Sequence, residues 1–343
     1  MSRRVRTLIV CGLLFVGLFE LALTMPVPYV VLTPGPTYNT LGADDNGNTI
    51  IVIHGTVPKR TDGHLNLTTV DVSTRSLTAF RALSGWLSHD HVVVPRAAVY
   101  PPGQSQQQVD QQNAQDFAES QDNAVAAASC ELGYPQKFGI IGLPAGSPSH
   151  GVLQPADVLV SMNGKPANTQ TALFALLAAA TPGTSVSVTV VRAGHPFTGN
   201  VTLGQPLSGR TGAQLGVEVG TICAMPFSVD LGLGNQIGGP SAGLMFALGI
   251  MDEVGPVDLT NGMFIAGTGT LTPTGDVGPI GGIALKMIAA RRAGATVFLT
   301  PAGNCPDVVN ATPKGLRIVK VSSLHDAVTD LKAIAAGQSV PSC

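Results

Sequence analysis

The longest apolar run of the chain is residues 7–24, where Glu20 is the only charged residue. About 18 residues just suffice for a helix to cross a bilayer, and we expect an uncleaved anchor in residues 1–25. The alternative is a secretory signal, for which residues 22–24 make a poor cleavage site. Three arginines precede the run: Arg3, Arg4 and Arg6. By the positive-inside rule they predict a single-pass membrane protein whose bulk, after Pro26, is extracytoplasmic.

Residues 26–132 alternate between short apolar and polar stretches, which predict a small α/β region. A proline-stiffened, extended segment at 26–36 follows the anchor. The pattern predicts strands at 49–54, 65–72 and 92–94 and a helix at 77–87. The glutamine-rich residues 104–115 predict an exposed loop, and the alanine-rich residues 116–132 predict a helix.

Residues 133–205 contain a second pattern, with Gly139-Ile140-Ile141-Gly142, the stretch GVLQPADVLVSMNG at 151–164, a helix at 169–180 and an alternating strand at 185–191. This order resembles a bacterial-type PDZ domain. The resemblance implies that a peptide adds as a strand to the sheet edge and that loop N–H groups receive its C-terminal carboxylate. Phe138, Gly139 and Ile140 would form this peptide-binding site. The alternative is a packing module without a ligand.

Two apolar, helix-like runs at 242–251 and 283–290 carry the candidate chemistry. Ser241 stands at the start of the first, where unpaired backbone N–H groups can stabilise an oxyanion. Lys286 lies within the second, where burial would lower its pKa and make it a general base for a serine. The structural alternatives are that Ser241 only caps its helix and that Lys286 extends its amine to the surface.

The segments GGPSAGLMFAL and TGTLTPTGDVGPIGGIALKMIAARRAGATVFLTPAGN, within residues 212–335, resemble the proteolytic domain of Lon proteases. The resemblance implies that Ser241 is the nucleophile, that Lys286 is the base and that Thr268 holds the lysine by a hydrogen bond. This sequence departs from the family at two places. Gly238 replaces a frequent acidic residue, and Ala284-Leu285 replaces a Lys-Glu pair, which affects the expected substrate contacts and activation.

Composition narrows the function classes further. Of the 343 residues, 44% are hydrophobic and 12% are charged, which indicates several folded domains. A net charge of −2 gives no electrostatic case for nucleic acid. No P-loop motif for ATP occurs, and we expect no cofactor. We also expect no metal site, since four histidines lack ligand spacing: His54, His64, His89 and His91.

The cysteines suit an oxidising environment. Cys11 falls in the anchor, and four others remain: Cys130, Cys223, Cys305 and Cys343. We favour the pairs Cys305 with Cys343 and Cys130 with Cys223. Four free buried thiols are the alternative.

The order of the segments resembles the membrane-anchored PDZ–Lon proteases of Gram-positive bacteria over nearly the whole chain. We expect an α+β fold divided into an anchor (1–25), an α/β region (26–132), a PDZ domain (133–205) and a Lon-type domain (212–343), with a linker at 204–212. The predicted function is an ATP-independent serine endopeptidase that acts on proteins or peptides, with oxyanion contacts from N–H groups near Gly239 and Ser241. The rival is a membrane PDZ adaptor whose Lon-type domain is a structural or oligomerisation platform. A homo-oligomer fits either function.

Overall fold

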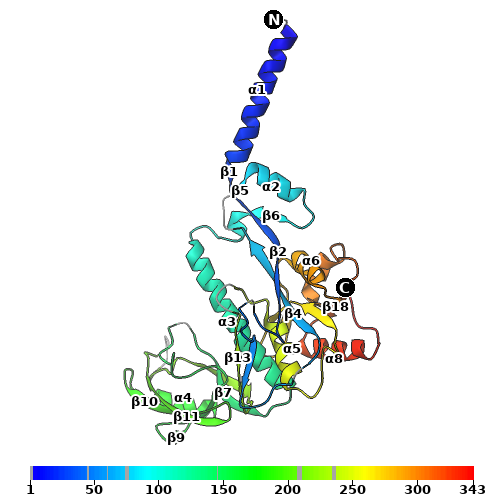
Figure 1. Cartoon of the computed structure of the whole chain (residues 1–343). Coiled ribbons are helices and arrows are strands. Elements are labelled where there is room, and N and C mark those ends of the chain that lie inside the picture. The colour runs from blue at the N-terminus through cyan, green and yellow to red at the C-terminus, as the bar shows by residue number, and fades with distance from the viewer. Residues whose placement is uncertain are drawn as a thin grey trace.

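A computed structural model describes residues 3–44, 46–59, 61–73, 77–144, 146–206, 211–233 and 237–343. The fold is mixed α+β, with helix α1 (Arg3–Thr24) projecting from a folded body (Figure 1). In the described part of the chain, α1 is the one helix long and apolar enough to cross a membrane. Its 22 residues extend about 33 Å, and none of their side chains is buried in the body. The predicted apolar segment is therefore a continuous helix.

A six-stranded sheet forms the centre of the body, in the order β18-β17-β14-β4-β2-β6. The strands are β2 (Tyr29–Asn39), β4 (His64–Val72), β6 (Val92–Pro95), β14 (Phe264–Gly267), β17 (Val297–Pro301) and β18 (Arg317–Val321). Strand β14 runs parallel to both β4 and β17, whereas β2 runs antiparallel to β4 and β6. The chain thus brings strands from both of its ends into one sheet.

Helices cover both faces of this sheet. Alternate strand residues point to opposite sides, so each strand contributes side chains to both layers of helices. On one face, Ile265 and Leu299 join a core with α3 (Gln106–Glu131), α5 (Gly243–Val254) and α8 (Leu324–Ala335). On the other face, Ala266 and Phe298 pack with α6 (Ile283–Ala293) and α7 (Cys305–Val308). Helix α5 is buried along most of its length, as its continuous apolar run predicts.

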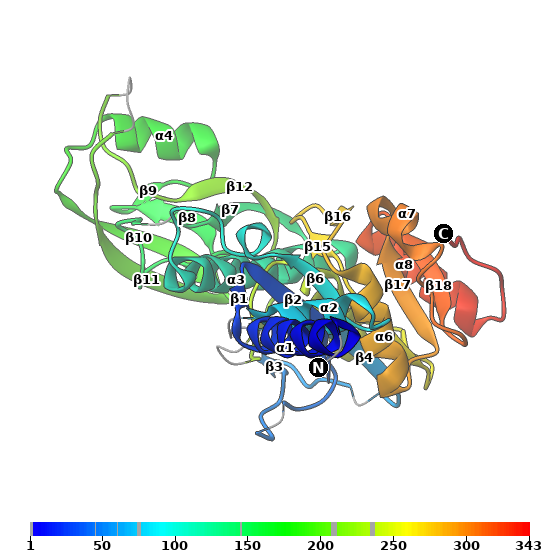
Figure 2. The same ribbon diagram turned by 90° about the horizontal axis from the view of Figure 1, so that it is seen from above.

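A second sheet has the order β11-β10-β8-β7-β12 and its own hydrophobic core (Figure 2). Its elements are β7 (Gln136–Gly142), β8 (Val158–Met162), β9 (Lys165–Pro166), α4 (Gln170–Ala178), β10 (Ser185–Arg192), β11 (His195–Thr202) and β12 (Glu218–Cys223). A tight turn joins β8 and β9, with Asn163 and Gly164 at positive φ.

Smaller elements complete the fold. Two-stranded pairs join β1 (Pro26–Val27) to β5 (Leu77–Thr78), β3 (Ile51–His54) to β13 (Ser228–Leu231), and β15 (Thr270–Leu271) to β16 (Val277–Gly278). Helix α2 (Ala79–Trp86) follows β5, and short 3-10 turns lie at Arg96–Ala98 and Ala302–Asn304. The predicted strands and helices of residues 49–94, 242–251 and 283–290 are all present within a few residues of their expected limits.

The two sheets do not follow the predicted division of the chain. Residues 26–132 do not form a separate α/β region, because β2, β4 and β6 belong to the same sheet as β14, β17 and β18. The predicted domain boundary at residue 212 is wrong as well, because β12 pairs with β7 in the second sheet. We call this sheet the PDZ-like sheet, after the sequence resemblance of residues 133–205. Strand β14 lies inside the sheet, hydrogen-bonded to β17 on one side and to β4 on the other. Residues 207–210 of the predicted linker lie outside the described residues.

The prediction of an exposed loop at 104–115 is wrong. Helix α3 already begins at Gln106 and runs for 26 residues. Ser105 and Gln108 form a capping box, in which each side chain bonds the backbone N–H of the other residue. Most of the glutamines are exposed, so the prediction of a polar surface is right but its backbone conformation is not.

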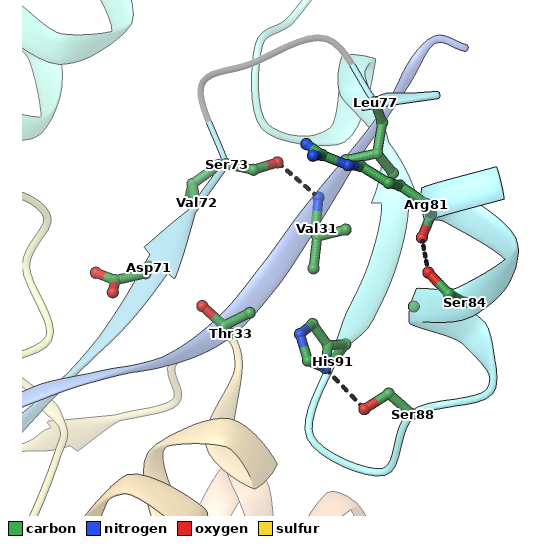
Figure 3. A pocket seen from close by; sticks show the side chains of 11 residues that line it. Val31, Thr33, Asp71, Val72, Ser73, Leu77, Arg81, Ser84, Ser88 and His91 are labelled. Atoms are coloured by element: carbon green, nitrogen blue, oxygen red, sulfur yellow. Dashed lines mark hydrogen bonds between the residues drawn. The ribbon is translucent and has the colours of Figure 1, made fainter. Parts of the chain in front are cut away.

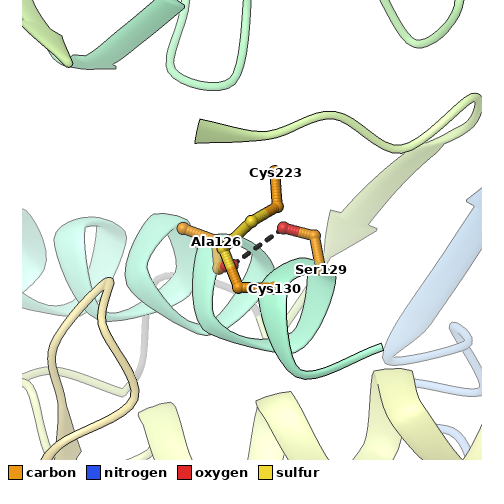
Figure 4. Close-up of a disulfide and its surroundings, with 4 residues drawn as sticks. All are labelled: Ala126, Ser129, Cys130 and Cys223. Carbon is orange, nitrogen blue, oxygen red and sulfur yellow. Dashed lines mark hydrogen bonds between the residues drawn. A yellow bond between two sulfur atoms is a disulfide. The ribbon is translucent and has the colours of Figure 1, made fainter. Parts of the chain in front are cut away.

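Two disulfides are present, and both join the predicted partners. Cys130 at the end of α3 is bonded to Cys223 at the end of β12 (Figure 4), and Cys305 in α7 is bonded to Cys343. Cys11 is free and exposed on α1. The first disulfide therefore attaches the PDZ-like sheet to the longest helix of the body.

Candidate active site

Ser241 lies directly before α5, after a loop that contains Gly239 and Pro240. Gly239 has a φ of +87°, a conformation that glycine adopts without strain. The N-cap of α5 is Ala242, and no side chain caps this helix start. Ser241 is thus not a capping residue, because its hydroxyl faces Lys286 instead.

Lys286 lies on the buried face of α6, together with Ile283, Met287 and Ala290. These positions follow the i, i+3, i+4, i+7 pattern of a helix face that packs on a core. The lysine is only 4% exposed, so its amine does not reach the surface. Its Nζ lies 2.7 Å from Ser241 Oγ.

Thr268 connects these two residues from the end of β14, where it is fully buried. The Thr268 hydroxyl donates to the carbonyl oxygen of Ser241 at 3.0 Å, and the Gly269 N–H donates to the same oxygen at 3.0 Å. Because the Thr268 proton is used in that bond, its oxygen accepts from Lys286 Nζ at 2.9 Å. The threonine therefore orients the amine and holds the backbone at the serine.

Burial lowers the pKa of Lys286 from 10.5 to about 8. The neutral amine keeps N–H groups and gains a lone pair. It can therefore donate to Thr268 while accepting the proton of Ser241 Oγ. The network has the connections that a serine–lysine pair needs for proton transfer.

The oxyanion contacts differ from the prediction for Gly239. The N–H of Gly239 donates to the carbonyl oxygen of Asn113 in α3 at 2.8 Å, so it is not free to bind an oxyanion. Pro240 has no N–H. The N–H groups of Ser241 and Ala242 remain at the start of α5, and neither donates to another residue in the described part of the chain. These N–H groups, unlike that of Gly239, are available as donors.

Helix α3 supports the loop before Ser241 through contacts that the sequence did not predict. The Ser120 hydroxyl donates to the carbonyl oxygen of Pro240 at 2.9 Å, next to the bond from Gly239 to Asn113. A Cβ atom on Gly238 would lie 2.8 Å from the Cβ of Asn113. The contact with α3 therefore explains why glycine replaces the acidic residue of the Lon pattern. The capping box at Ser105 was the sequence signal for this helix.

A buried asparagine holds the loop before α6. Asn304 donates from Nδ2 to the carbonyl oxygen of Ile280 and accepts from the N–H of Ile280, both at 2.9 Å. Leu285 is buried, which suits the apolar residue in place of the Lys-Glu pair. The Pro301-x-x-Asn304 motif thus fixes the chain shortly before Lys286.

A cleft of about 330 Å³ opens onto Ser241 and Lys286. Backbone and side chains of β2 and β4 form one wall, and the loop before α5 forms the other. It is lined by Pro36, Tyr38, Leu67, Thr68, Thr69, Val70, Asp71, Ile237, Gly238, Gly239, Ala242 and Gly281. Asp71 also lines a larger hollow of about 750 Å³ between β2, β4 and α2 (Figure 3). The serine is therefore reachable from an extended surface.

The structure does not leave the predicted peptide-binding residues free. Phe138, Gly139 and Ile140 lie on β7, where they pair with Thr221, Gly220 and Val219 of β12. On the other side of β7, the N–H of Ile140 donates to the carbonyl oxygen of Asp157 at 2.9 Å. A peptide strand cannot add to this part of β7 unless β12 leaves. The adjacent hollow of about 790 Å³ lies between α4 and residues 211–219.

Among the residues that the structure describes, no three His, Cys, Asp or Glu side chains gather as metal ligands. His91 instead contacts Asp90 at 2.8 Å in an exposed turn, and Asp90 also pairs with Arg292.

Comparison with known proteins identifies a recognised type of domain in the segment that carries Ser241 and Lys286. Residues 236–333 match the family model of the Lon protease (S16) C-terminal proteolytic domain. The chain is 31% identical over 98 residues to Lon protease 2 of Bacillus subtilis, which covers 29% of this chain and 17% of that protein. It is 46% identical over 71 residues to the mitochondrial Lon protease homolog of Emericella nidulans, which covers 20% of this chain and 6% of that protein.

One solved structure is similar to part of the chain. It is the PDZ domain of the SdrC-like protein from Listeria monocytogenes, at 12% identity and a TM-score of 0.23, over 24% of this chain and 85% of that chain. The chain spans at most 17% of the length of the two Lon relatives. Residues 236–333 include Ser241, Thr268 and Lys286, and their similarity to a Lon proteolytic domain implies a serine peptidase.

Proposed function

We propose that this protein is a membrane-anchored serine endopeptidase that uses Ser241 as nucleophile and Lys286 as general base. The observation that carries the proposal is the 2.7 Å contact between Lys286 Nζ and Ser241 Oγ, in which Lys286 is a buried residue with 4% of its surface exposed. The Lon match of residues 236–333 supports the same reaction. Substrates are proteins or peptides that enter the cleft along β4.

In the proposed reaction, Lys286 accepts the proton of Ser241 as Oγ attacks the scissile carbonyl carbon. The N–H groups of Ser241 and Ala242 stabilise the resulting oxyanion. When the C–N bond breaks, Lys286 gives its proton to the leaving amine, and the acyl group stays on Ser241 as an ester. Water then hydrolyses this ester, with Lys286 again as the base.

The proposed location is extracytoplasmic, with α1 as the anchor. Its support is the apolar helix and the three arginines before it, which favour an inner position for that end. In intact cells, added protease should then digest residues after Pro26. Digestion only after lysis would contradict this orientation. The absence of a P-loop motif from the sequence supports catalysis without ATP.

For the PDZ-like sheet, we propose gating over substrate capture. Strand β12 already occupies the β7 edge, and the disulfide from Cys223 attaches this strand to α3. Helix α3 in turn contacts the loop before Ser241 through Asn113 and Ser120. A change at the edge of the PDZ-like sheet thus has a direct physical connection to the catalytic loop.

The first experiment separates this enzyme from the rival PDZ adaptor. The full-length protein in detergent is incubated with an unfolded protein, with and without ATP. Wild type should cleave equally in both conditions, and Ser241→Ala and Lys286→Arg should not cleave, because alanine has no nucleophile and a guanidinium stays protonated. Ser342→Ala and Lys332→Met change exposed residues that line neither the cleft nor the hollow, and they serve as matched controls. Equal cleavage by Ser241→Ala would exclude Ser241 as the nucleophile.

A further inference from the structure

Helix α2 has the reverse of the usual distribution of apolar residues. Its small residues, Ala82 and Gly85, are buried against the body, and a Cβ on Gly85 would lie 2.8 Å from Val93 Cγ2. Its large apolar residues, with Leu87 directly after it, point outward: Phe80 is 43% exposed, Leu83 55%, Trp86 58% and Leu87 76%. A helix of a water-soluble domain normally buries its large residues and exposes polar ones.

This exposed face is fixed beside the end of α1. The N–H of Ala79 donates to the carbonyl oxygen of Met25 at 3.2 Å, and β1 pairs with β5 just before α2. The rings of Phe19 and Phe80 contact edge to face, with centroids 6.0 Å apart. Since eight residues of helix extend about 12 Å, all of α2 stays close to the end of α1. Figure 1 shows α2 lying across the end of α1.

We propose that α2 lies in the interfacial layer of the lipid bilayer, with Phe80, Leu83, Trp86 and Leu87 toward the acyl chains. The proposal rests on the anchoring role proposed for α1. The apolar surface of α1 continues directly onto α2, so the bilayer that covers one also reaches the other. Trp, Phe and Leu are the residues that interfacial helices insert, and tryptophan favours the headgroup level.

This placement determines where substrates meet the protein. The inner side of α2 lines the 750 Å³ hollow through Arg81, Ser84 and Gly85 (Figure 3). Asp71 of β4 lines both this hollow and the catalytic cleft. With α2 on the lipid surface, the hollow opens beside the membrane. The substrate class it fits is a polypeptide segment that emerges from the bilayer.

The test uses Trp86, which is the single tryptophan of the chain. The full-length protein is reconstituted into phosphatidylcholine–phosphatidylglycerol vesicles, with ordinary acyl chains or with chains brominated close to the headgroup. Flotation on a density gradient first establishes whether α1 holds the protein on the vesicles. We expect a blue-shifted Trp86 emission that loses most of its intensity in the brominated vesicles and resists quenching by aqueous iodide.

A matched control moves the tryptophan away from the bilayer, in the variant Trp86→Phe with Val57→Trp. Val57 is exposed and follows β3, which pairs with β13 in the half of the body away from α1 (Figure 1). Its emission should respond to iodide and ignore the brominated lipids.

The remaining outcomes contradict the proposal in distinguishable ways. Iodide quenching of wild-type Trp86 would show that α2 faces water. A blue-shifted emission that brominated lipids leave unchanged would show that protein, such as a second copy of this chain, covers the helix. Failure of the protein to float would overturn the proposed anchor, and the interfacial position of α2 with it.

Discussion

Lys286 lies where its charged form is unfavourable, as the proposed general base requires. Buried on α6, it has a pKa of about 8, and it contacts both Ser241 and Thr268. A neutral amine accepts a proton, whereas an ammonium cannot. The same burial therefore has one effect on activity and another on stability.

Activity should rise with pH through the folded-state pKa of Lys286. We expect kcat/KM for a peptide substrate to reach half of its maximum near pH 8 and then to level off, because only the neutral amine accepts the Ser241 proton. Thr268→Val removes the hydroxyl that accepts from Lys286 and should lower kcat/KM. A profile that is flat from pH 6 to 10, with the fold intact by circular dichroism, would exclude Lys286 as the base.

Stability should respond in the opposite sense when the lysine is replaced. The pKa of Lys286 is lower in the folded than in the unfolded chain. Below pH 8 the buried ammonium therefore lowers the free energy of unfolding by about 3 kcal/mol, and this loss disappears as the pH rises from 8 to 10.5. Lys286→Met should therefore raise the free energy of unfolding at pH 7, although the loss of the hydrogen bonds to Ser241 and Thr268 offsets part of the gain. The gain should shrink as the pH approaches 10.5. Denaturant unfolding at both pH values measures this difference. The exposed-site variant Lys332→Met should show no such trend.

The sequence was enough to predict that Ser241, Thr268 and Lys286 meet, because the motif blocks have the order and spacing of a known domain. It was not enough to predict which N–H groups are free. The N–H of Gly239 donates to the carbonyl oxygen of Asn113, which lies outside the residues that match that domain. A hydrogen bond between distant parts of the chain leaves no local pattern.

Among the elements, α3 supports the site from outside the segment that matches the Lon domain. It packs on α5, meets the loop before Ser241 and ends at a disulfide. Its polar, glutamine-rich first turns lack an apolar stripe, which is why residues 104–115 looked like a loop. The capping box and the packing of Phe117 and Ala124 stabilise a helix that periodicity does not show.

Loosening the contact between α3 and the catalytic loop should slow the reaction without moving its pH dependence. Ser120→Ala removes the hydrogen bond to Pro240, which is worth about 0.5–1.5 kcal/mol, so we expect roughly a 2- to 10-fold lower kcat. Its matched control is Ser129→Ala, since Ser129 is a buried serine of the same helix whose hydroxyl donates to the carbonyl oxygen of Ala126 (Figure 4). A shifted pH midpoint in Ser120→Ala would mean that Ser120 acts on Lys286 and not on the loop.

In the whole molecule, the two disulfides make it possible to separate an effect on stability from an effect of the PDZ-like sheet on the site at Ser241. Chain entropy predicts at most about 5 kcal/mol for Cys130–Cys223 and about 4 kcal/mol for Cys305–Cys343, from sequence separations of 93 and 38. Replacing either pair with alanine should lower Tm. Only the Cys130/Cys223 variant should also change cleavage rates below its Tm, because only that disulfide joins β12 to α3. Equal changes in both variants would argue against gating by the PDZ-like sheet.

The placement of β4 has a consequence for how the chain comes to fold. Thr68 of β4 bonds the carbonyl oxygen of Gly267, a residue 199 positions later, and β4 lies between β2 and β14 in the sheet. Such non-local pairing makes folding slow, because the chain loses the entropy of closing a long loop before any stabilising contact between the two strands forms. During synthesis β4 emerges early and keeps one unpaired edge until residues 264–267 arrive. The cleft, whose wall β4 forms, therefore cannot take shape in a partly synthesised chain, and the contact between Ser241 and Lys286 forms only after β14 and α6 have been made.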